Sequence, residues 1–162
     1  MSVISLSMEI WEFNRGRTLA TLDDISKQPD PQAALAWRPG PGRAHIAWQL
    51  MHIGITEELF ATARLRGAES AYPDLVPRFR GGSTPDDDIP QLSQIREILA
   101  AARGHLRETV SAITESDLSK IPEGFKERGW PIRTILQIIG WHEAHHQGQA
   151  HITLNLWKAA QR

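Results

Sequence analysis

The chain has 162 residues, enough for one domain with a well-buried core, and we expect a single domain over residues 1–162. Hydrophobic residues make up 41% and charged residues 23% of a chain with net charge −1. This is the composition of an ordinary globular protein, with no basic block that would bind nucleic acid. There is no cysteine, which excludes disulfides and thiolate metal sites, so any metal must be bound by His, Asp, Glu or water.

Neither a membrane span nor a secretion signal is expected from the sequence. No stretch approaches the roughly 18 consecutive apolar residues of a transmembrane helix. The first nine residues contain neither a basic segment nor a long apolar run, so they do not resemble a signal peptide. Together with the lack of cysteine, these features predict a cytoplasmic protein.

Apolar residues recur at helical spacing in four long segments, which we predict to be amphipathic helices. Proline and glycine punctuate the stretches between them, as in the loop at 37–42. Proline at position 131 suits the opening of a helix. The predicted helices run from about Val3 to Lys27, from Arg43 to Arg66, from Gln91 to Thr114, and from Pro131 through Trp157.

Two longer connections separate these helices. Residues 67–90 are rich in Gly, Pro, Asp and Ser, and a connection of this length is typical of a crossover or a lid. Residues 115–131 are irregular, with a short turn expected at 116–119. Four amphipathic helices without a strand pattern predict an all-α protein, a four-helix bundle in which a long crossover lets helices two and three lie parallel.

Two histidines on the last predicted helix stand one turn apart. His142 and His146 project from the same face, about 6 Å apart along the helix axis. That face also carries the apolar residues expected to point into the bundle. Two buried imidazoles destabilise a fold unless they are satisfied. A divalent metal ion would satisfy them, and so would hydrogen bonds within the core, so the pair alone leaves both interpretations open.

Five further histidines could complete a metal site. Helical phase turns His145 and His151 away from the inward face, so we expect both at the surface or an interface. His105 lies off the apolar stripe of the third helix, and we expect its side chain to be solvated.

The two remaining candidates both lie on the apolar arc of the second helix. His45 and His52 are about 10 Å apart along the axis and cannot share one ion. His45 falls in the first turn, where a capping or rim role is expected. His52 lies near the middle of its helix, level with His142 and His146 when the two helices pack. The predicted metal ligands are therefore His52, His142 and His146.

These residues also carry a family resemblance. The segment Ala-Trp-Gln-Leu-Met-His-Ile at 47–53, followed by His-Glu-Ala-His-His-Gln-Gly-Gln at 142–149, resembles the DinB/YfiT superfamily of metal-dependent enzymes. The resemblance covers nearly the whole chain. It implies a bundle in up-down-down-up order, a three-histidine site for a divalent ion such as zinc or nickel, and often a homodimer. Characterised relatives include thiol-dependent isomerases and transferases that act with mycothiol or bacillithiol.

The chemistry of such a site suggests an enzyme acting on a small molecule. Three neutral imidazoles leave a divalent ion its full charge and an open position, where water or a thiol can be activated. We therefore expect a hydrolase or a thiol-dependent transferase. For a transferase, the resemblance implies a low-molecular-weight thiol of the bacillithiol or mycothiol type as a partner. A non-catalytic protein of the stress response that binds a metal or a small ligand is the alternative. A purely structural helical dimer is the third hypothesis.

No plain general base accompanies the predicted ligands. Glu143 follows the first ligand directly, and we expect it to hydrogen-bond a ligand histidine or form a salt bridge rather than to catalyse. Gln149 could reach back toward the site, although a packing role suits it equally. The two acidic residues one turn beyond His52 are expected to be solvated or ion-paired: Glu57 and Glu58, with Arg64 or Arg66 as partners.

The substrate pocket is expected between the second and fourth helices, roofed by the connections 67–90 and 115–131. Three tryptophans, at positions 37, 48 and 130, could line it or belong to the core. Two arginines in the first connection, Arg78 and Arg80, could bind an anionic cosubstrate or be solvated loop charges.

A second apolar strip runs along the fourth helix. It consists of Ile138, Trp141, Ile152 and Leu156, about a third to half a turn from the inward face. A helix that is apolar on two sides is buried on two sides. We predict a two-fold dimer contact through this strip, and the alternative is cover by helix one or three of the same chain.

Overall fold

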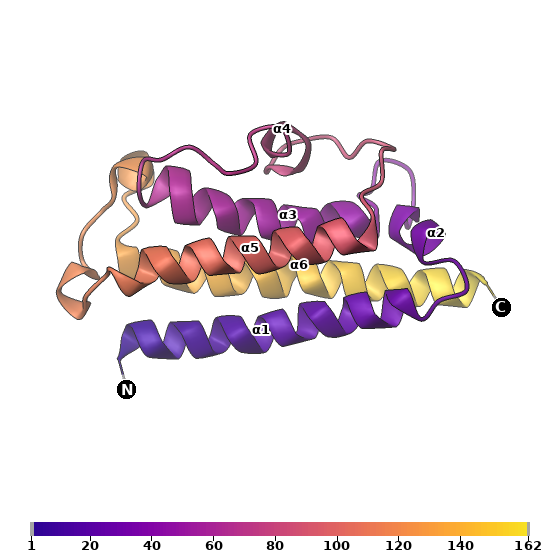
Figure 1. Ribbon diagram of the computed structural model, residues 1–162, viewed down its shortest axis with the longest axis horizontal. Coiled ribbons are helices and arrows are strands. Elements are labelled where there is room, and N and C mark those ends of the chain that lie inside the picture. Colours follow the sequence, from indigo (N-terminus) through magenta and orange to yellow (C-terminus); the bar gives the residue numbers. More distant parts are fainter. Residues whose placement is uncertain (1, 162) are drawn as a thin grey trace.

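The computed structural model describes residues 2–161, and helices make up its framework (Figure 1). Four long helices lie side by side: α1 (Val3–Ser26), α3 (Ile46–Leu59), α5 (Leu92–Ser111) and α6 (Ile132–Ala160). Helix α3 packs against α5 and α6, and α1 packs against α6 and α5. Within residues 2–161 no strand is present, so the predicted all-α class is confirmed.

Five short helical segments join the long ones. They are α2 (Pro31–Ala36), α4 (Val76–Phe79), the π-helical turn η1 (Phe60–Arg64) and the 3₁₀ turns η2 (Glu115–Asp117) and η3 (Glu123–Arg128). Helix α2, which begins at Pro31, was not predicted from the sequence. Asp30 caps α2, because its carboxylate accepts a hydrogen bond from the amide of Ala33, and proline suits the first position after such a cap.

Helix α1 begins at the predicted residue, and the other ends of the long helices lie within three residues of the predicted ones, except that α3 ends at Leu59 and not near Arg66. Helix α3 begins at Ile46 because His45 caps it: its Nδ1 accepts a hydrogen bond from the amide of Trp48 at 3.0 Å. This confirms the capping role expected for His45. Pro131 is the cap of α6 and not its first residue. At its other end, α3 continues directly into the π-helical turn η1. Together α3 and η1 reach Arg64, two residues before the predicted end at Arg66.

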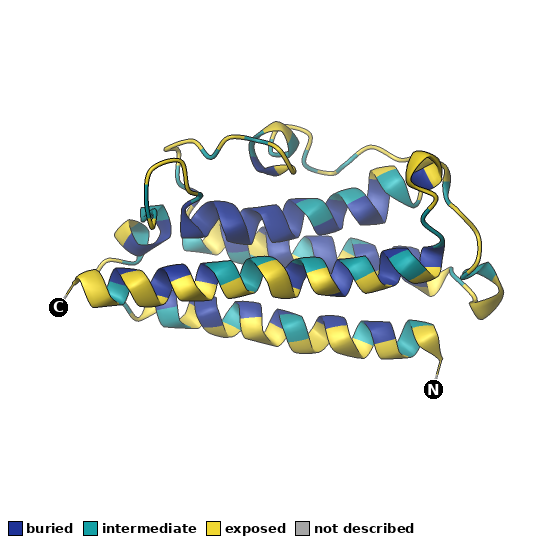
Figure 2. Ribbon diagram, turned by 180° about the vertical axis from the view of Figure 1, so that it is seen from behind, coloured by how far each residue is buried: buried dark blue, intermediate teal, exposed yellow. Residues whose placement is uncertain are grey.

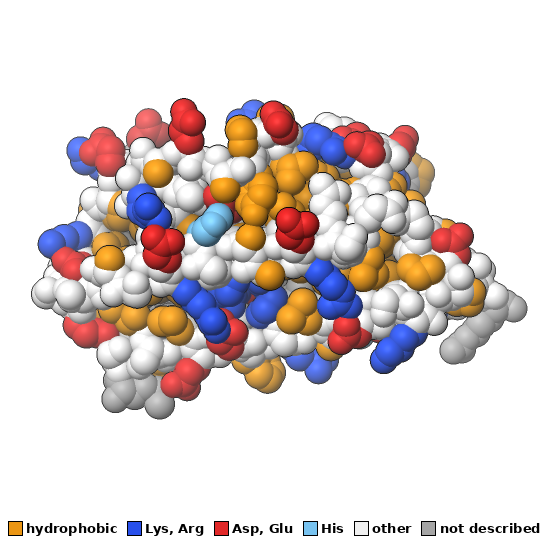
Figure 3. All heavy atoms as spheres, viewed as in Figure 1, with side chains coloured by type: hydrophobic (Ala, Val, Ile, Leu, Met, Phe, Trp, Pro, Cys, Tyr) orange, Lys and Arg blue, Asp and Glu red, His pale blue; other side chains and the backbone are white. Residues whose placement is uncertain are grey.

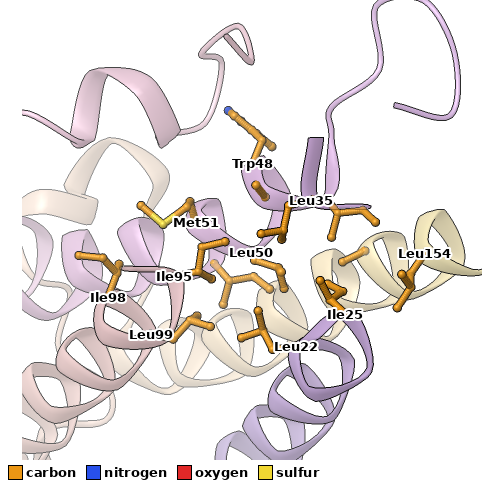
Figure 4. Close-up of a cluster of buried hydrophobic side chains, with 14 of the residues drawn as sticks. Leu22, Ile25, Leu35, Trp48, Leu50, Met51, Ile95, Ile98, Leu99 and Leu154 are labelled. Carbon is orange, nitrogen blue, oxygen red and sulfur yellow. The ribbon is translucent and has the colours of Figure 1, made fainter. Parts of the chain in front are cut away.

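The main hydrophobic cluster joins all four long helices. Figure 4 shows Leu22 and Leu154, from α1 and α6, pointing toward side chains of α3 and α5. Helix α3 is the central element, since 12 of its 14 residues are buried, and its dark ribbon in Figure 2 lies beneath the 67–90 connection. Polar side chains on α3, including His52, are therefore buried as well, and each needs a partner.

A second cluster lies toward the opposite end of the bundle. Trp11 of α1 is 1% exposed there, and its indole N–H donates to the carbonyl of Leu136 on α6 at 3.1 Å. Phe125 of η3 stacks on Phe60 with ring centroids 5.6 Å apart. Phe125 thus anchors the 115–131 connection to the bundle, while most other residues of this connection are exposed.

No helix within residues 2–161 is both long and apolar enough to cross a membrane. On the face shown in Figure 3, acidic and basic side chains are interspersed, and apolar side chains lie exposed between them.

Gly54 of α3 lies close against Ile98 of α5, and we expect Gly54→Ala to destabilise the fold. An added Cβ would lie 2.8 Å from Cγ2 of Ile98, and the backbone of Ile98 is only 3.6 Å away. Overpacking of this kind costs about 1–3 kcal/mol. Gly104→Ala on α5 is the matched control: nothing lies within 4 Å of the new methyl group, and alanine in a helix gains about 0.5–1 kcal/mol over glycine. Urea unfolding of both variants tests this, and equal shifts would contradict it.

Candidate metal centre

Three histidines from two helices converge at the middle of the bundle. His52 projects from α3, and His142 and His146 project from adjacent turns of α6. Their ligand nitrogens all lie within 4.8 Å of one another, and the Nε2 atoms of His52 and His142 are 3.1 Å apart. The structure therefore brings together the three residues that the sequence analysis selected.

Hydrogen bonds fix the tautomers of two of these rings. The Nδ1–H of His52 donates to the carbonyl of Phe79 at 2.6 Å. The Nδ1–H of His146 donates to the side-chain oxygen of Gln49, also at 2.6 Å. Because both acceptors are oxygens without a proton to give, each Nδ1 is the protonated nitrogen and each Nε2 keeps its lone pair. Such partners orient ligand histidines in metal sites.

A stacked tryptophan also holds His52 in place. The rings of Trp48 and His52 are 4.6 Å apart at an interplanar angle of 11°. The indole N–H of Trp48 is anchored to the carbonyl of Arg78 at 3.1 Å. Trp48 and Gln49 precede His52 by four and three residues, the spacing that brings side chains to one helix face. Gln49 was not predicted as a partner of the cluster, although its position three residues before His52 places both side chains on one face of α3. The hydrogen bond from His52 to the Phe79 carbonyl could not be predicted, because no sequence pattern marks a backbone acceptor in a loop.

The residues present fit a divalent metal ion. At tetrahedral angles, ligand nitrogens about 2.0–2.1 Å from zinc lie roughly 3.3 Å apart, close to the 3.1 Å between the Nε2 atoms of His52 and His142.

The three histidines also have the protonation state that a metal needs, since metal-ligating imidazoles must be neutral. Burial, followed by the neighbouring His146 and His52, lowers the pKa of His142 to about 3. Burial, followed by His52 and His145, lowers the pKa of His146 to about 3, and burial lowers the pKa of His52 as well.

The metal-free protein is expected to lose stability as the pH falls from about 6.5 toward 3. In the unfolded chain these histidines take up protons near pH 6.5, whereas the folded chain holds His142 and His146 neutral down to about pH 3. The unfolded state binds more protons across this interval, so the free energy of unfolding falls with pH. Urea unfolding of chelator-treated protein measures this slope. The double variant His142→Gln, His146→Gln should have a shallower slope, and an unchanged one would contradict the argument.

Beneath the histidines lies a buried network of four charged side chains. Arg15 of α1 and Arg103 of α5 each bind both Glu57 of α3 and Glu143 of α6. The Glu143 contacts measure 2.7 Å to Arg15 and 2.6 Å to Arg103, and Thr18 donates a further hydrogen bond at 2.8 Å. Each of the four side chains is no more than 7% exposed.

This network corrects the expectations for the acidic residues. Glu143 bonds arginines and a threonine instead of a ligand histidine, so the salt-bridge interpretation applies to it. Glu57 is buried in the same network. It was expected to be solvated or paired with Arg64 or Arg66, and this was wrong. Glu58 is 0% exposed and accepts from the Nδ1–H of His105 at 2.6 Å. His105 is thus a partner of a buried carboxylate and not the free solvated side chain that was expected.

Gln149 and His145 of the α6 motif are not members of the histidine cluster. Gln149 does not reach back toward the histidine cluster; its amide bonds the Nε2 of His145 at 2.7 Å. His145 and His151 are exposed, as predicted.

An open cleft of about 630 Å³ leads to the cluster, with His52 and His142 in its wall. Helix α3 and the turn η1 form one side, α6 forms another, and both long connections contribute, as predicted for the roof. The residues lining it are His52, Thr56, Leu59, Phe60, Ala63, Arg64, Val76, Arg80, Gly81, Phe125, Arg128, Trp130, Ile138, Trp141 and His142.

The structure shows which of the three tryptophans and two arginines lie at the cleft and which have other roles. Trp130 lines the cleft, while Trp48 is buried behind His52 and Trp37 packs against the core. Arg78 is occupied by ion pairs with two aspartates of its own loop, so it is a structural loop charge. Arg80 lines the cleft.

Comparisons with known proteins agree with this architecture. A family model described as the DinB superfamily matches residues 10–150. A similar solved structure is that of the conserved protein of locus from Enterococcus faecalis, with a TM-score of 0.74 and 19% identity, covering 96% of this chain and 97% of that one. At this identity the likeness shows the fold alone. A search of curated proteins finds no match. The family model spans most of the sequence and includes all three clustered histidines, so the chain belongs to the DinB superfamily.

Proposed function

We propose that this protein is a metal-dependent enzyme whose divalent ion, zinc or nickel, is held by His52, His142 and His146. The observation that carries the proposal is the pairing of a preorganised histidine cluster with an open cleft. Hydrogen bonds to Gln49 and Phe79 leave the Nε2 atoms of His146 and His52 unprotonated, as metal ligation requires. A bound ion would supply a strong electrophile that activates water or a thiol as a nucleophile.

Of the two reaction types, the side chains that line the cleft favour thiol-dependent transfer over hydrolysis. Within residues 2–161, no carboxylate lines the cleft, and Glu57 and Glu143 are committed to arginines. The described lining of the cleft thus contains no carboxylic acid to protonate a poor leaving group, as amide hydrolysis needs. A thiol that attacks an electrophile needs no such acid. We therefore favour a transferase that uses a low-molecular-weight thiol on a small electrophilic substrate.

Activity assays with metal-loaded and chelator-treated protein test this proposal. Pairs of a thiol and an electrophile, such as bacillithiol or cysteine with a chloronitrobenzene, are expected to react faster with the loaded protein. Esters and amides serve as the comparison for hydrolysis. Metal-dependent turnover of esters with no thiol reaction would replace the transferase by a hydrolase. Tight metal binding without any turnover would favour the alternative, a non-catalytic protein that binds a metal or small ligand.

The up-down-down-up order of the four long helices is also a proposal. It is supported by the sequence colours in Figure 1, where α1 and α6 run in one direction and α3 and α5 in the other. The long 67–90 connection joins the two helices that share a direction, as a crossover requires.

We further propose a homodimer formed through the outer strip of α6. Ile152 and Leu156 are 60% and 48% exposed, so α1 and α5 of the same chain leave them uncovered. The other two residues of the predicted strip, Ile138 and Trp141, line the cleft instead. Ile152→Glu with Leu156→Glu is expected to convert a dimer to a monomer at micromolar concentration, because a buried unpaired charge opposes association. Analytical ultracentrifugation measures the mass of each form. A wild-type protein that sediments as a monomer would remove this proposal.

A further inference from the structure

Three arginines face the cleft that leads to the histidine cluster. Arg64, Arg80 and Arg128 line it together with aromatic and aliphatic side chains, and no aspartate or glutamate is among the lining residues. Their neighbours in sequence, Arg66 and Arg78, form ion pairs with carboxylates. Within residues 2–161, none of the three cleft arginines forms such an ion pair. Positive charge is therefore concentrated in this cleft although the chain as a whole carries a net charge of −1.

The backbone on either side of Arg80 is held against His52. The preceding carbonyl, of Phe79, accepts the hydrogen bond from His52. The following residue, Gly81, lies so close that an added Cβ would be 3.9 Å from Cε1 of His52. Arg80 is consequently anchored at the edge of the histidine cluster by contacts on both sides.

Close packing of η3 on η1 brings the other two arginines to the same cleft. A Cβ added at Gly124 would lie 2.7 Å from the carbonyl oxygen of Arg64, so this position requires glycine. The guanidinium of Arg64 lies 5.5 Å from the ring centre of Phe125. That of Arg128 lies 4.8 Å from the ring centre of Trp130. A guanidinium supported on a ring face keeps its N–H edge free for a carboxylate or phosphate.

We propose that the cleft binds a small molecule that carries an anionic oxygen group, a carboxylate or a phosphate, which Arg64, Arg80 and Arg128 recognise. The apolar body of the ligand lies along Trp130 and Trp141, and the end that reacts extends to the histidine cluster. The placement of the reacting end at the histidine cluster rests on the proposed function. Recognition of the anionic group does not rest on it, because the arginines bind an anion without a metal ion.

Binding to chelator-treated protein tests the arginine site separately from the metal site. The probes are phenylacetate and phenyl phosphate, with phenylacetamide as the uncharged match for phenylacetate. ¹H–¹⁵N spectra follow the indole N–H signals of Trp130 and Trp141 during titration. Both anions are expected to shift these signals and to bind about tenfold or more tightly than the amide, as charge-assisted hydrogen bonds do.

Charge-removing variants identify the groups responsible. Arg64→Gln, Arg80→Gln and Arg128→Gln are each expected to weaken binding of the anions several-fold, and the triple variant to make them bind no better than phenylacetamide. Arg17→Gln, an exposed arginine on α1 outside the cleft, is the control and should leave binding unchanged. Lysine at the three positions should restore part of the affinity.

The outcomes separate this inference from the proposed function. Equal binding of phenylacetate and phenylacetamide, or full affinity in the triple variant, would overturn the anion site even if the protein binds metal. Preference for the anions that depends on the three arginines would support it even if the histidines bind no metal.

Discussion

Replacing His52 by alanine is expected to abolish tight metal binding. One of three ligands is lost, so the affinity for zinc should fall by more than the roughly 10–100-fold seen when a hydrogen-bond partner of a ligand is removed. Gln49→Leu removes such a partner from His146 and should fall within that range. Competition with a chromogenic chelator measures both affinities, and mass spectrometry of untagged protein measures the metal content of each preparation.

His151→Ala is the matched control for the loss of a histidine. His151 lies on α6 like two of the ligands, but it is exposed and outside the cluster, so its variant should bind metal like the wild type. Circular dichroism and thermal melting establish that His52→Ala remains folded. Equal metal content in folded His52→Ala and wild type would exclude this histidine cluster as the metal site.

Glu143→Ala is expected to be the most destabilising of the single substitutions considered. Glu143 is shared by two buried arginines, and its removal leaves Arg15 and Arg103 with Glu57 as their one shared buried carboxylate. Breaking a buried ion pair in this way costs about 3–5 kcal/mol. Urea unfolding of chelator-treated protein measures the loss of stability without a contribution from metal binding.

Glu12→Ala provides an internal control for this prediction. Glu12 binds the same Arg103, but its side chain is 46% exposed, and surface ion pairs contribute about 1 kcal/mol or less. A loss of similar size for both variants would show that burial does not set the strength of this network. A Glu143→Ala protein that keeps its stability would contradict the role assigned to the four charges.

The buried network also fixes the position of α6 along the bundle axis, so that His142 lies at the same level as His52. Arg15, Arg103, Glu57 and Glu143 come one from each long helix, so together they tie the four helices at one level. Glu143 directly follows His142 in the sequence. The network therefore positions His142 without touching its ring, which is a structural role.

Helical periodicity was sufficient to predict the long helices and the clustered histidines. Residues three and four apart share a helix face whatever the rest of the protein does, so the pairing of His142 with His146 and the choice of His52 over His45 followed from spacing and depth. The short helices α2 and α4 were missed because their prolines and their few residues give no periodic signal.

The sequence by itself determined the all-α class, the pairing of His142 with His146 and the exposure of His145 and His151, because each depends on the local geometry of one helix. His52 could be selected because it lies near the middle of its own helix, at the level expected for the histidine pair. Tertiary structure alone decided the partners of Glu57, Glu58 and Glu143, the carbonyl of Phe79 that orients His52, and the meeting of three arginines in one cleft. These contacts join residues from different elements, and their distances depend on how whole helices and connections pack. A periodic pattern carries no information on that packing, so such partners became visible only in the folded chain.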